Sequence, residues 1–194
     1  MLRLPEDALL LIVDVQEGFD DPRWGWRNNP DVEENIARLL DVWRRSRRPI
    51  IHVQHLSREA DSPLRPGQLG CAIKGAVRPL PGEPVLNKSV NSAFIGTDLE
   101  LRLRARGAPA LVVAGLTTDH CVSTTARMAG NLGFATVVVA DATATFDRTG
   151  PDGRRYDAET VHDVALASLH GEFATVVMTE DLLAGLEPAA GARH

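Results

Sequence analysis

The chain has 194 residues, of which 44% are hydrophobic and 24% are charged, and its formal net charge at pH 7 is -5. A chain of this length buries a full hydrophobic core without disulfides or metal, so we expect one domain spanning residues 1–194. The negative net charge argues against a nucleic-acid partner, because phosphate backbones are usually met by clustered positive charge.

Neither the hydropathy nor the cysteine content predicts a membrane or secreted protein. No stretch approaches the roughly 20 apolar residues that span a bilayer, and residues 1–7 lack the plan of a signal peptide. We therefore expect no membrane contact and a cytoplasmic location. Cys71 and Cys121 are the two cysteines, and a reducing cytosol keeps such thiols free. The absence of a C-x-x-C pair argues against a structural zinc site.

Short apolar runs rich in β-branched residues alternate with segments of helical periodicity along the chain. The runs are apolar on both faces, which is typical of strands inside a parallel sheet. We predict strands at residues 8–15, 49–54, 110–115, 135–142 and 174–179, and helices at residues 31–46, 97–107, 120–133 and 157–172. This alternation predicts right-handed crossovers. The expected fold class is α/β, with a three-layer α/β/α arrangement and a mostly parallel open sheet of Rossmann-type topology.

Residues 57–88 are rich in Pro and Gly and show no convincing period. An irregular region of that length is usually functional, although part of it can simply cover an edge of the sheet. We expect this region and residues 20–29 to shape a pocket for a small-molecule substrate. Neither segment identifies that substrate.

Ligands of open α/β sheets bind beyond the carboxyl ends of the strands, and this rule selects two residues. Asp14 follows the first apolar run in "LIVDVQEGF", where its carboxylate faces a crevice or, alternatively, caps a turn. Cys121 in "GLTTDHCVST" lies where the third predicted strand turns into a helix. The dipole of a helix N-terminus lowers a thiol pKa, which favours a nucleophile, while a buried packing cysteine is the alternative.

Lysine is rare in this chain, since only Lys74 and Lys88 occur among 21 basic residues. Lys88 in "VLNKSVNSAF" follows an apolar pair, where a compact ammonium reaches an interior site that a planar guanidinium does not. Compositional bias alone also leaves a few lysines, so this indication is weak by itself.

The three candidates occur in segments that resemble the isochorismatase-like cysteine hydrolases, which include nicotinamidase, N-carbamoylsarcosine amidohydrolase and isochorismatase. The resemblance covers nearly the whole chain, from "LLLIVDVQEGF" through "VLNKSVNSAF" and "LVVAGLTTDHCV" to "VVVADATATF". It implies a catalytic triad of Asp14, Lys88 and Cys121. It also implies a cis peptide between Leu116 and Thr117 and a homo-oligomer, either a dimer or a tetramer.

The resemblance implies hydrolysis of an amide or related C–N bond through a covalent acyl-enzyme, with no cofactor. In this mechanism Asp14 accepts the thiol proton, Lys88 holds the carboxylate and thiolate electrostatically, and Cys121 attacks a carbonyl carbon. The backbone N–H groups of Thr117 and Cys121 then form an oxyanion hole. Isochorismatase itself cleaves a vinyl ether without the cysteine, so Cys121 argues against that substrate.

Several side chains near these motifs are candidate substrate contacts. The aromatic residues Phe19, Trp24 and Phe94 are expected to line an apolar pocket, with plain packing as the alternative. His55 is expected to face the pocket as a substrate contact. His120 is adjacent to Cys121, so the two do not share a helix face and a catalytic role for His120 is not expected.

No metal site is expected. The metal-binding nicotinamidases of this superfamily carry a carboxylate and paired histidines after the second strand. Here that position reads "IIHVQHLSREAD", in which His52 and His55 are present but the carboxylate-His-x-His set is incomplete. His52, on a strand, is expected to be a core or edge histidine.

Two functions without hydrolysis are the alternatives. A dinucleotide-binding or flavodoxin-like protein fits the same sheet, but no G-x-G-x-x-G follows the first strand. A catalytically silent member of the fold that acts as a binding or assembly module is not excluded by the fold alone. The reactivity of Cys121 relative to Cys71 separates that module from an enzyme.

Overall fold

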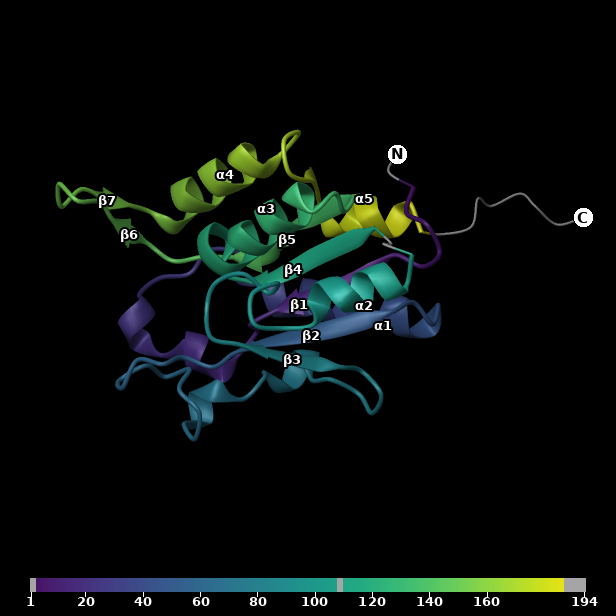
Figure 1. The fold of residues 1–194 in the computed structure, drawn as a ribbon. Helices are drawn as coiled ribbons and strands as arrows, with labels where there is room; N and C mark the ends of the chain where they lie inside the picture. The colour runs from purple at the N-terminus through teal and green to yellow at the C-terminus, as the bar shows by residue number, and fades with distance from the viewer. Residues whose placement is uncertain (1–2, 108–109, 187–194) are drawn as a thin grey trace, which may run out of the picture.

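A six-stranded parallel sheet forms the centre of the protein in a computed structural model that describes residues 3–107 and 110–186 (Figure 1). The strands lie in the order β3-β2-β1-β4-β5-β8, and every neighbouring pair is parallel. Their bounds are β1 Leu9–Val13, β2 Ile50–His55, β3 Val85–Lys88, β4 Leu111–Leu116, β5 Thr136–Ala144 and β8 Thr175–Val177. This arrangement confirms the predicted fold class.

The direction of winding reverses between β1 and β4. From β1 the chain adds β2 and β3 on one side, and then β4, β5 and β8 on the other. A reversal of this kind leaves a crevice beyond the carboxyl ends of the two central strands, because the connections leave them in opposite directions. The topology therefore selects the residues that follow β1 and β4.

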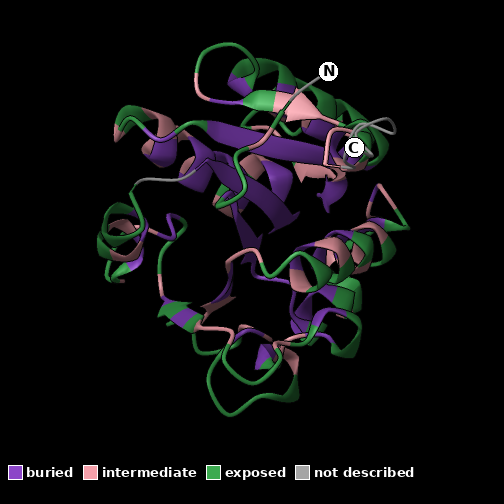
Figure 2. Cartoon of the chain, turned by 90° about the vertical axis from the view of Figure 1, so that its right-hand side faces the viewer, coloured by how far each residue is buried: buried purple, intermediate pink, exposed green. Residues whose placement is uncertain are grey.

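Helices cover both faces of the sheet, and the helix bounds are α1 Val32–Arg45, α2 Leu99–Ala105, α3 Ser123–Asn131, α4 Ala158–Leu169 and α5 Thr179–Ala184. The helices α1 and α5 pack on one face of the sheet, and α2, α3 and α4 pack on the other. In α1 the buried side chains are Val32, Ile36, Leu39, Leu40 and Trp43. This spacing places them on one stripe of a helix. Figure 2 shows the strands as buried ribbon between helices of mixed exposure.

The structure contains short elements that the sequence did not predict. The edge strand β3 lies in the irregular region. Its four residues alternate between exposed and buried, so they do not form the continuous apolar run by which the other strands were predicted. The hairpin of β6 Arg148–Thr149 and β7 Arg155–Tyr156 has two residues in each strand, and α5 has six residues. Elements of this length have too few residues for a readable period.

The close approach of β4 to β1 requires Gly115. Its φ is 126°, and a Cβ atom placed there would lie 2.0 Å from the backbone oxygen of Val13. No side chain fits in that space, so glycine is needed for β4 to end directly beside the end of β1. The turn that follows β4 is thereby brought against Asp14.

The loops that follow the strands gather at one end of the molecule. The 3-10 turns Glu17–Asp20 and Pro22–Trp24 lie near this end, as does the β6–β7 hairpin at the left of Figure 1. Among the residues that the structure describes, no helix is long and apolar enough to cross a membrane.

Candidate active site

Four polar side chains meet at the carboxyl edge of the sheet. Asp14 directly follows β1, His55 is the last residue of β2, and Lys88 is the last residue of β3. Cys121 lies in the turn that follows β4. His55 and Lys88 are direct partners in the β2–β3 ladder. The topology therefore brings together four residues, each more than thirty positions from the next along the chain.

Lys88 contacts each of the other three side chains of this group. Its Nζ atom donates to Asp14 Oδ2 at 2.5 Å, to Cys121 Sγ at 3.3 Å and to the backbone oxygen of Val90 at 3.1 Å. The same atom lies 3.1 Å from His55 Nδ1. The side chains of Lys88 and Asp14 have no exposed surface. An ammonium thus lies between the carboxylate and the thiol, at hydrogen-bond distance from each.

Burial controls the protonation of the acid and the thiol. Burial raises the pKa of Asp14 to about 6, although the Lys88 ammonium opposes the rise. Burial, reinforced by the negative charge of Asp14, raises the pKa of Cys121 to about 12, again against the effect of Lys88. At neutral pH the resting site therefore holds an ionised Asp14 and a neutral thiol.

The expectation that a helix N-terminus lowers the Cys121 pKa is wrong. Cys121 lies within a π-helical turn, Thr118–Val122, that precedes α3, and the loss of solvent around the sulfur outweighs any stabilisation of a thiolate. Activation of this thiol therefore needs a base beside it. Asp14 Oδ1 is buried and has no hydrogen-bond partner within residues 3–107 and 110–186, so it is free to accept a proton.

His55 is a neutral acceptor in this group. Burial, together with the Lys88 ammonium, lowers the pKa of His55 to about 4. Because an ammonium only donates, Nδ1 of His55 accepts the Lys88 N–H and the ring proton resides on Nε2. The side chain of His55 is half-buried and lines the same cavity as Cys121.

Ligand atoms of Asp14, His55 and Cys121 lie within 4.8 Å of one another, a spacing that a metal ion could bridge. The Lys88 ammonium lies within 3.3 Å of an atom of each of these residues. A divalent cation at their centre would lie against this ammonium, and like charges repel strongly in a buried site. These residues therefore fit the lysine better than a metal.

The turn that carries Cys121 is held by its own backbone. The peptide bond between Leu116 and Thr117 is cis, at the position that the family resemblance implies. The Thr117 carbonyl accepts the N–H groups of His120 and Val122 at 3.2 and 3.1 Å. The turn is thereby closed on both sides of Cys121, and both Thr117 and Cys121 line the cavity.

The cavity over the thiol has a volume of about 210 Å³. Phe19 and Trp24 line it, as expected, and their rings pack on each other at 5.6 Å and on Phe146 at 6.2 and 5.8 Å. The expectation for Phe94 is wrong, because this residue is absent from the cavity lining. Phe94 stacks on Phe134 at 6.0 Å and packs with the hydrophobic core on the α3 side of the sheet.

Comparison with known proteins places the chain in a family. A family model described as the isochorismatase domain matches residues 8–181. The chain belongs to the isochorismatase family. The uncharacterised family member YrdC of Bacillus subtilis is 47% identical over 180 residues, which cover 93% of this chain and 96% of YrdC. A crystal structure of a family protein from Chromobacterium violaceum is 50% identical, with a TM-score of 0.92 and coverage of 95% of this chain and 96% of that one.

Relatives with named activities also belong to the isochorismatase family. The ureidoacrylate amidohydrolase RutB of Methylobacterium radiotolerans is 35% identical over an alignment of 207 residues, which covers 89% of this chain and 76% of RutB. Other relatives carry the names streptothricin hydrolase and nicotinamidase. The enzyme class expected from the sequence is thereby confirmed at the level of the family.

The sequence analysis missed Arg148, a charged residue in the cavity of this isochorismatase-family chain. Its Nε donates to Asp119 Oδ2 at 2.7 Å, and its Nη2 donates to Asp119 Oδ1 at 3.1 Å and to Thr145 Oγ1 at 3.3 Å. Asp119 lies two residues before Cys121, so this pairing ties the guanidinium to the turn that carries Cys121. Arg148 begins the two-residue strand β6, and its sequence context carries no signal that distinguishes it from other arginines.

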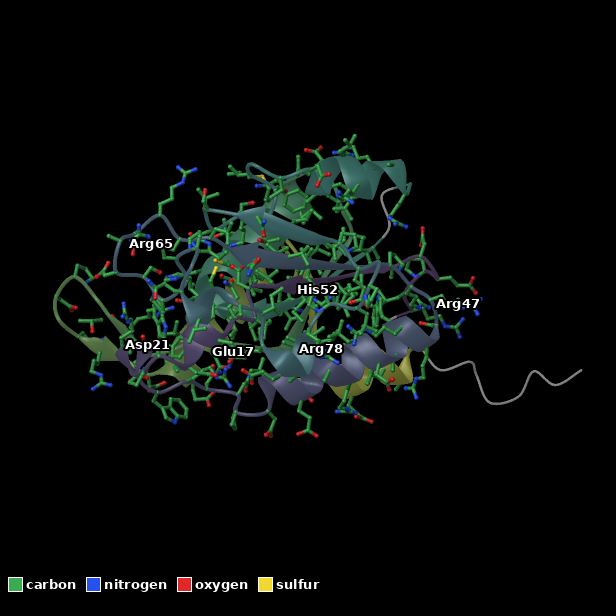
Figure 3. All side chains as sticks on the ribbon, turned by 90° about the horizontal axis from the view of Figure 1, so that it is seen from below. Glu17, Asp21, Arg47, His52, Arg65 and Arg78 are labelled. Atoms are coloured by element: carbon green, nitrogen blue, oxygen red, sulfur yellow. The ribbon has the colours of Figure 1, made fainter. Side chains whose placement is uncertain are left out.

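Two further histidines have different places relative to the site. His52 is buried in β2 and contacts Glu83 at 2.9 Å, which fits the expected core histidine. It is labelled near the middle of the view in Figure 3. His120 lines the cavity beside Cys121 but lies 3.4 Å from Asp119. No hydrogen bond joins His120 to Cys121 among the described residues, and the absence of a catalytic role for His120 stays a prediction.

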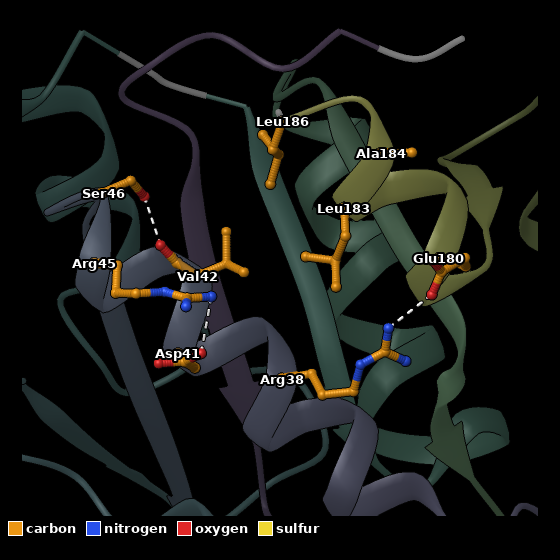
Figure 4. Close-up of a pocket in the computed structure, with 9 residues that line it drawn as sticks. All are labelled: Arg38, Asp41, Val42, Arg45, Ser46, Glu180, Leu183, Ala184 and Leu186. Atoms are coloured by element: carbon orange, nitrogen blue, oxygen red, sulfur yellow. Dashed lines mark hydrogen bonds and ion pairs between the residues drawn. The ribbon is translucent and has the colours of Figure 1, made fainter. Parts of the chain in front are cut away.

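A larger hollow, of about 570 Å³, lies between α1 and α5 (Figure 4). Its polar rim includes the ion pairs of Arg38 with Glu180 and of Arg45 with Asp41. The lining contains no cysteine, lysine or histidine: Arg38, Asp41, Val42, Arg45, Ser46, Glu180, Leu183, Ala184 and Leu186. The larger of these two cavities therefore lacks the cysteine, lysine and histidine that meet at the candidate active site.

Proposed function

We propose that this protein is a cysteine hydrolase that cleaves an amide or related C–N bond of a small molecule through a covalent acyl-enzyme. One observation carries the proposal: the buried Lys88 ammonium lies between Asp14 and Cys121, at 2.5 and 3.3 Å from their side-chain atoms, and both of these residues line the cavity. Asp14 and Cys121 are the base and nucleophile in this proposal. Lys88 supplies the positive charge that both anionic forms need.

Proton transfer accompanies the attack of the sulfur. The neutral thiol gives its proton to Asp14 Oδ1, the carboxylate oxygen that Lys88 does not engage. The S–H bond breaks as the S–C bond forms, because a free thiolate is scarce at neutral pH when burial raises the Cys121 pKa. The carbonyl oxygen then gains the negative charge, and the N–H groups of Thr117 and Cys121 are its proposed donors.

The second half of the reaction returns the proton. Protonated Asp14 donates to the leaving nitrogen as the C–N bond breaks, which leaves an acyl group on Cys121. Ionised Asp14 then takes a proton from water, whose oxygen attacks the thioester carbon. The acid product leaves, and Asp14 returns the proton to the sulfur. Asp14 thus acts in turn as base and acid, a role that suits its pKa of about 6.

The cavity favours a small substrate that carries a carboxylate. A volume of about 210 Å³ is below the range of roughly 300 to 1,000 Å³ that is usual for drug-sized ligands. Arg148 is the cavity's fixed cation, and Asp119 and Thr145 engage its Nε and Nη2 but not its Nη1. A guanidinium that keeps donors free is suited to bind a carboxylate. The name of RutB gives ureidoacrylate, which carries both a ureido group and a carboxylate.

The test is ammonia release from a panel of small primary amides, ureido acids and lactams, each offered with and without a carboxylate. We expect turnover of at least one carboxylate-bearing amide or ureido acid, and none by the Cys121→Ala variant. Turnover that persists in Cys121→Ala would contradict the covalent mechanism. The alternative, a silent binding or assembly module, predicts no turnover and no difference in thiol reactivity between Cys121 and Cys71.

Three further expectations belong to this proposal. We propose that residues 1–194 form one isochorismatase-like domain, that the protein is a homo-oligomer, either a dimer or a tetramer, and that it acts in the cytoplasm without a cofactor. Limited proteolysis tests the single domain, because a second domain would yield a stable fragment. Light scattering of the purified protein measures the oligomeric state, and cell fractionation measures the location.

A further inference from the structure

The Lys88 ammonium has more acceptors than it can satisfy. An ammonium carries three N–H donors. Four acceptors lie within 3.3 Å of Nζ: Asp14 Oδ2, His55 Nδ1, the Val90 backbone oxygen and Cys121 Sγ. At any moment at least one acceptor therefore lacks its own N–H.

The four acceptors differ in how well they compete. Asp14 is charged and holds its N–H at 2.5 Å, and the Val90 oxygen is a backbone acceptor just beyond β3. The competition is therefore between the His55 nitrogen at 3.1 Å and the Cys121 sulfur at 3.3 Å. A neutral thiol is a weak acceptor, whereas a thiolate is a charged one. The His55 imidazole is therefore the better acceptor of the Lys88 N–H while Cys121 is a thiol. The sulfur becomes the better acceptor once it has lost its proton.

We propose that His55 is a positioning residue that competes with the Cys121 sulfur for one N–H of Lys88 and so adds to the effect of burial that keeps the resting thiol protonated. When the S–H proton moves to Asp14, this N–H turns from His55 Nδ1 to the sulfur. Lys88 remains an ammonium throughout, and His55 keeps its single proton on Nε2, so no further proton is taken up or lost. The inference deepens the proposed function, because it assumes that Cys121 is the nucleophile.

The remaining charged groups of the cavity leave this competition intact. Glu59, His120 and Arg148 also line the cavity. Arg148 is paired with Asp119, and Glu59 is exposed. Within the described ranges, neither these three side chains nor Asp119 makes a hydrogen bond to Lys88 or Cys121. His55 is therefore the group whose substitution tests the competition most directly.

The experiment measures the pH dependence of Cys121 alkylation by iodoacetamide, located by peptide mapping, and needs no substrate. His55→Leu removes the acceptor, and His55→Asn keeps one near the Nδ1 position. Below the thiol pKa, each unit of decrease in that pKa raises the alkylation rate about tenfold. We expect His55→Leu to react at least about threefold faster than wild type at pH 8, and His55→Asn to restore the slow reaction. Cys71, measured in the same digest, should keep its wild-type rate.

The Leu and Asn variants separate the competition from a change in solvation. An apolar leucine removes polarity near the sulfur, which by itself raises a thiol pKa and slows alkylation. Faster alkylation in His55→Leu alone therefore supports the competition. An unchanged or slower rate in His55→Leu, or an equal increase in both variants, overturns it. These outcomes are independent of the amide panel, so failure of the proposed hydrolysis and failure of this inference are distinguishable.

A second measurement uses the unaltered protein and avoids any risk of misfolding. Nitrogen-15 NMR of histidine-labelled protein at pH 7 reports which ring nitrogen of His55 carries the proton. We expect the Nε2–H tautomer, with Nδ1 unprotonated and facing Lys88. A proton on Nδ1 would place two donors against each other and overturns the inference. The His55→Asn spectrum assigns the signal by its loss.

Discussion

Lys88 Nζ lies 2.5 Å from Asp14 Oδ2, and neither side chain is exposed to solvent. The pair sits at the carboxyl edge of the sheet, where Asp14 follows β1 and Lys88 ends β3. A buried ion pair contributes little net stability, because desolvation of both charges offsets their attraction. In the proposed mechanism the pair acts on Cys121, whose sulfur lies 3.3 Å from Lys88 Nζ, so its substitution should change both stability and activity.

Removal of one partner should destabilise the fold. Lys88→Met leaves the Asp14 carboxylate buried without its cation, and we expect a loss of about 3–5 kcal/mol in the free energy of unfolding. The double variant Asp14→Asn/Lys88→Met should recover much of this loss, because no buried charge is left. Urea denaturation measures both. Arg45→Met, which breaks an exposed pair with Asp41, is the control and should be nearly neutral. Equal stability of Lys88→Met and Arg45→Met would contradict the prediction.

The two cysteines should differ in their effect on activity. Cys121→Ala should abolish hydrolysis of any substrate found, whereas Cys71→Ala should leave it nearly intact. Cys71 is buried, and the Gln16 and Gln54 amides donate to its backbone oxygen and lie 4.0 Å from its sulfur. Among residues 3–107 and 110–186, no acid or cation hydrogen-bonds to this thiol. The measurement is turnover by folded variants. A Cys121→Ala rate above roughly a tenth of wild type, a barrier change below about 1.4 kcal/mol, would refute a covalent mechanism.

Lys88→Arg should also lose most of the rate, although it keeps the positive charge. A planar guanidinium is too large for the space between Asp14 and Cys121, where Nζ lies 2.5 and 3.3 Å from its partners. The Cys121→Ala/Lys88→Arg variant should be little slower than either single variant, because residues that act as one unit are not additive. Losses that multiply in the double variant would show independent roles. Comparison of the three kcat values tests this.

The rate should depend on the ionisation of Asp14. Its pKa is raised to about 6, so the carboxyl group is protonated below that pH and cannot accept the thiol proton. We expect kcat/KM to fall to about a tenth of its plateau at pH 5, with an apparent pKa that belongs to the coupled Asp14, Lys88 and Cys121 group. A flat profile between pH 5 and 7 would show that another group is the base.

The same ionisation should have the opposite effect on stability. Between pH 4 and 6 the folded protein binds more protons at Asp14 than the unfolded chain does, because folding raises this pKa. The Asp14 contribution to the free energy of unfolding should therefore fall as pH rises through that range. The difference between wild type and Asp14→Asn, measured by urea denaturation at several pH values, isolates this contribution. A difference that is independent of pH would mean that folding leaves this pKa unchanged.

Arg148 should determine the preference for anionic substrates. Arg148→Lys keeps the charge but loses the planar fork, and we expect kcat/KM for a carboxylate-bearing amide to fall at least about tenfold. The matching neutral amide should change by less than about threefold. Arg127→Lys is the control, because Arg127 hydrogen-bonds Ser123 and Ser168 outside the cavity lining. An equal loss on neutral and anionic substrates would assign Arg148 a structural role.

The sequence alone was sufficient for the fold class and for the candidate residues Asp14, Lys88 and Cys121. The parallel strands are buried on both faces, so their apolar runs are continuous and readable. The motif "GLTTDHCV" is also continuous, so the resemblance to the family could be recognised without a structure. The short edge strand β3 and α5 were not predicted, because neither is long enough to show a period.

Tertiary structure alone decided the electrostatics of the site and which residues line its cavity. The Cys121 pKa is raised because neighbouring elements exclude solvent from the sulfur, which the local signal of a helix start does not report. The Lys88 contact with His55 arises from register across β2 and β3, and the cavity position of Arg148 from its pairing with Asp119. The tertiary structure also removes a residue from the site. Phe94 lies close to Lys88 in the sequence and was expected to line the cavity, yet it packs on Phe134. Burial and pairing depend on residues distant in the chain, so a local motif names the chemical groups while only the packed fold sets their charge and contacts.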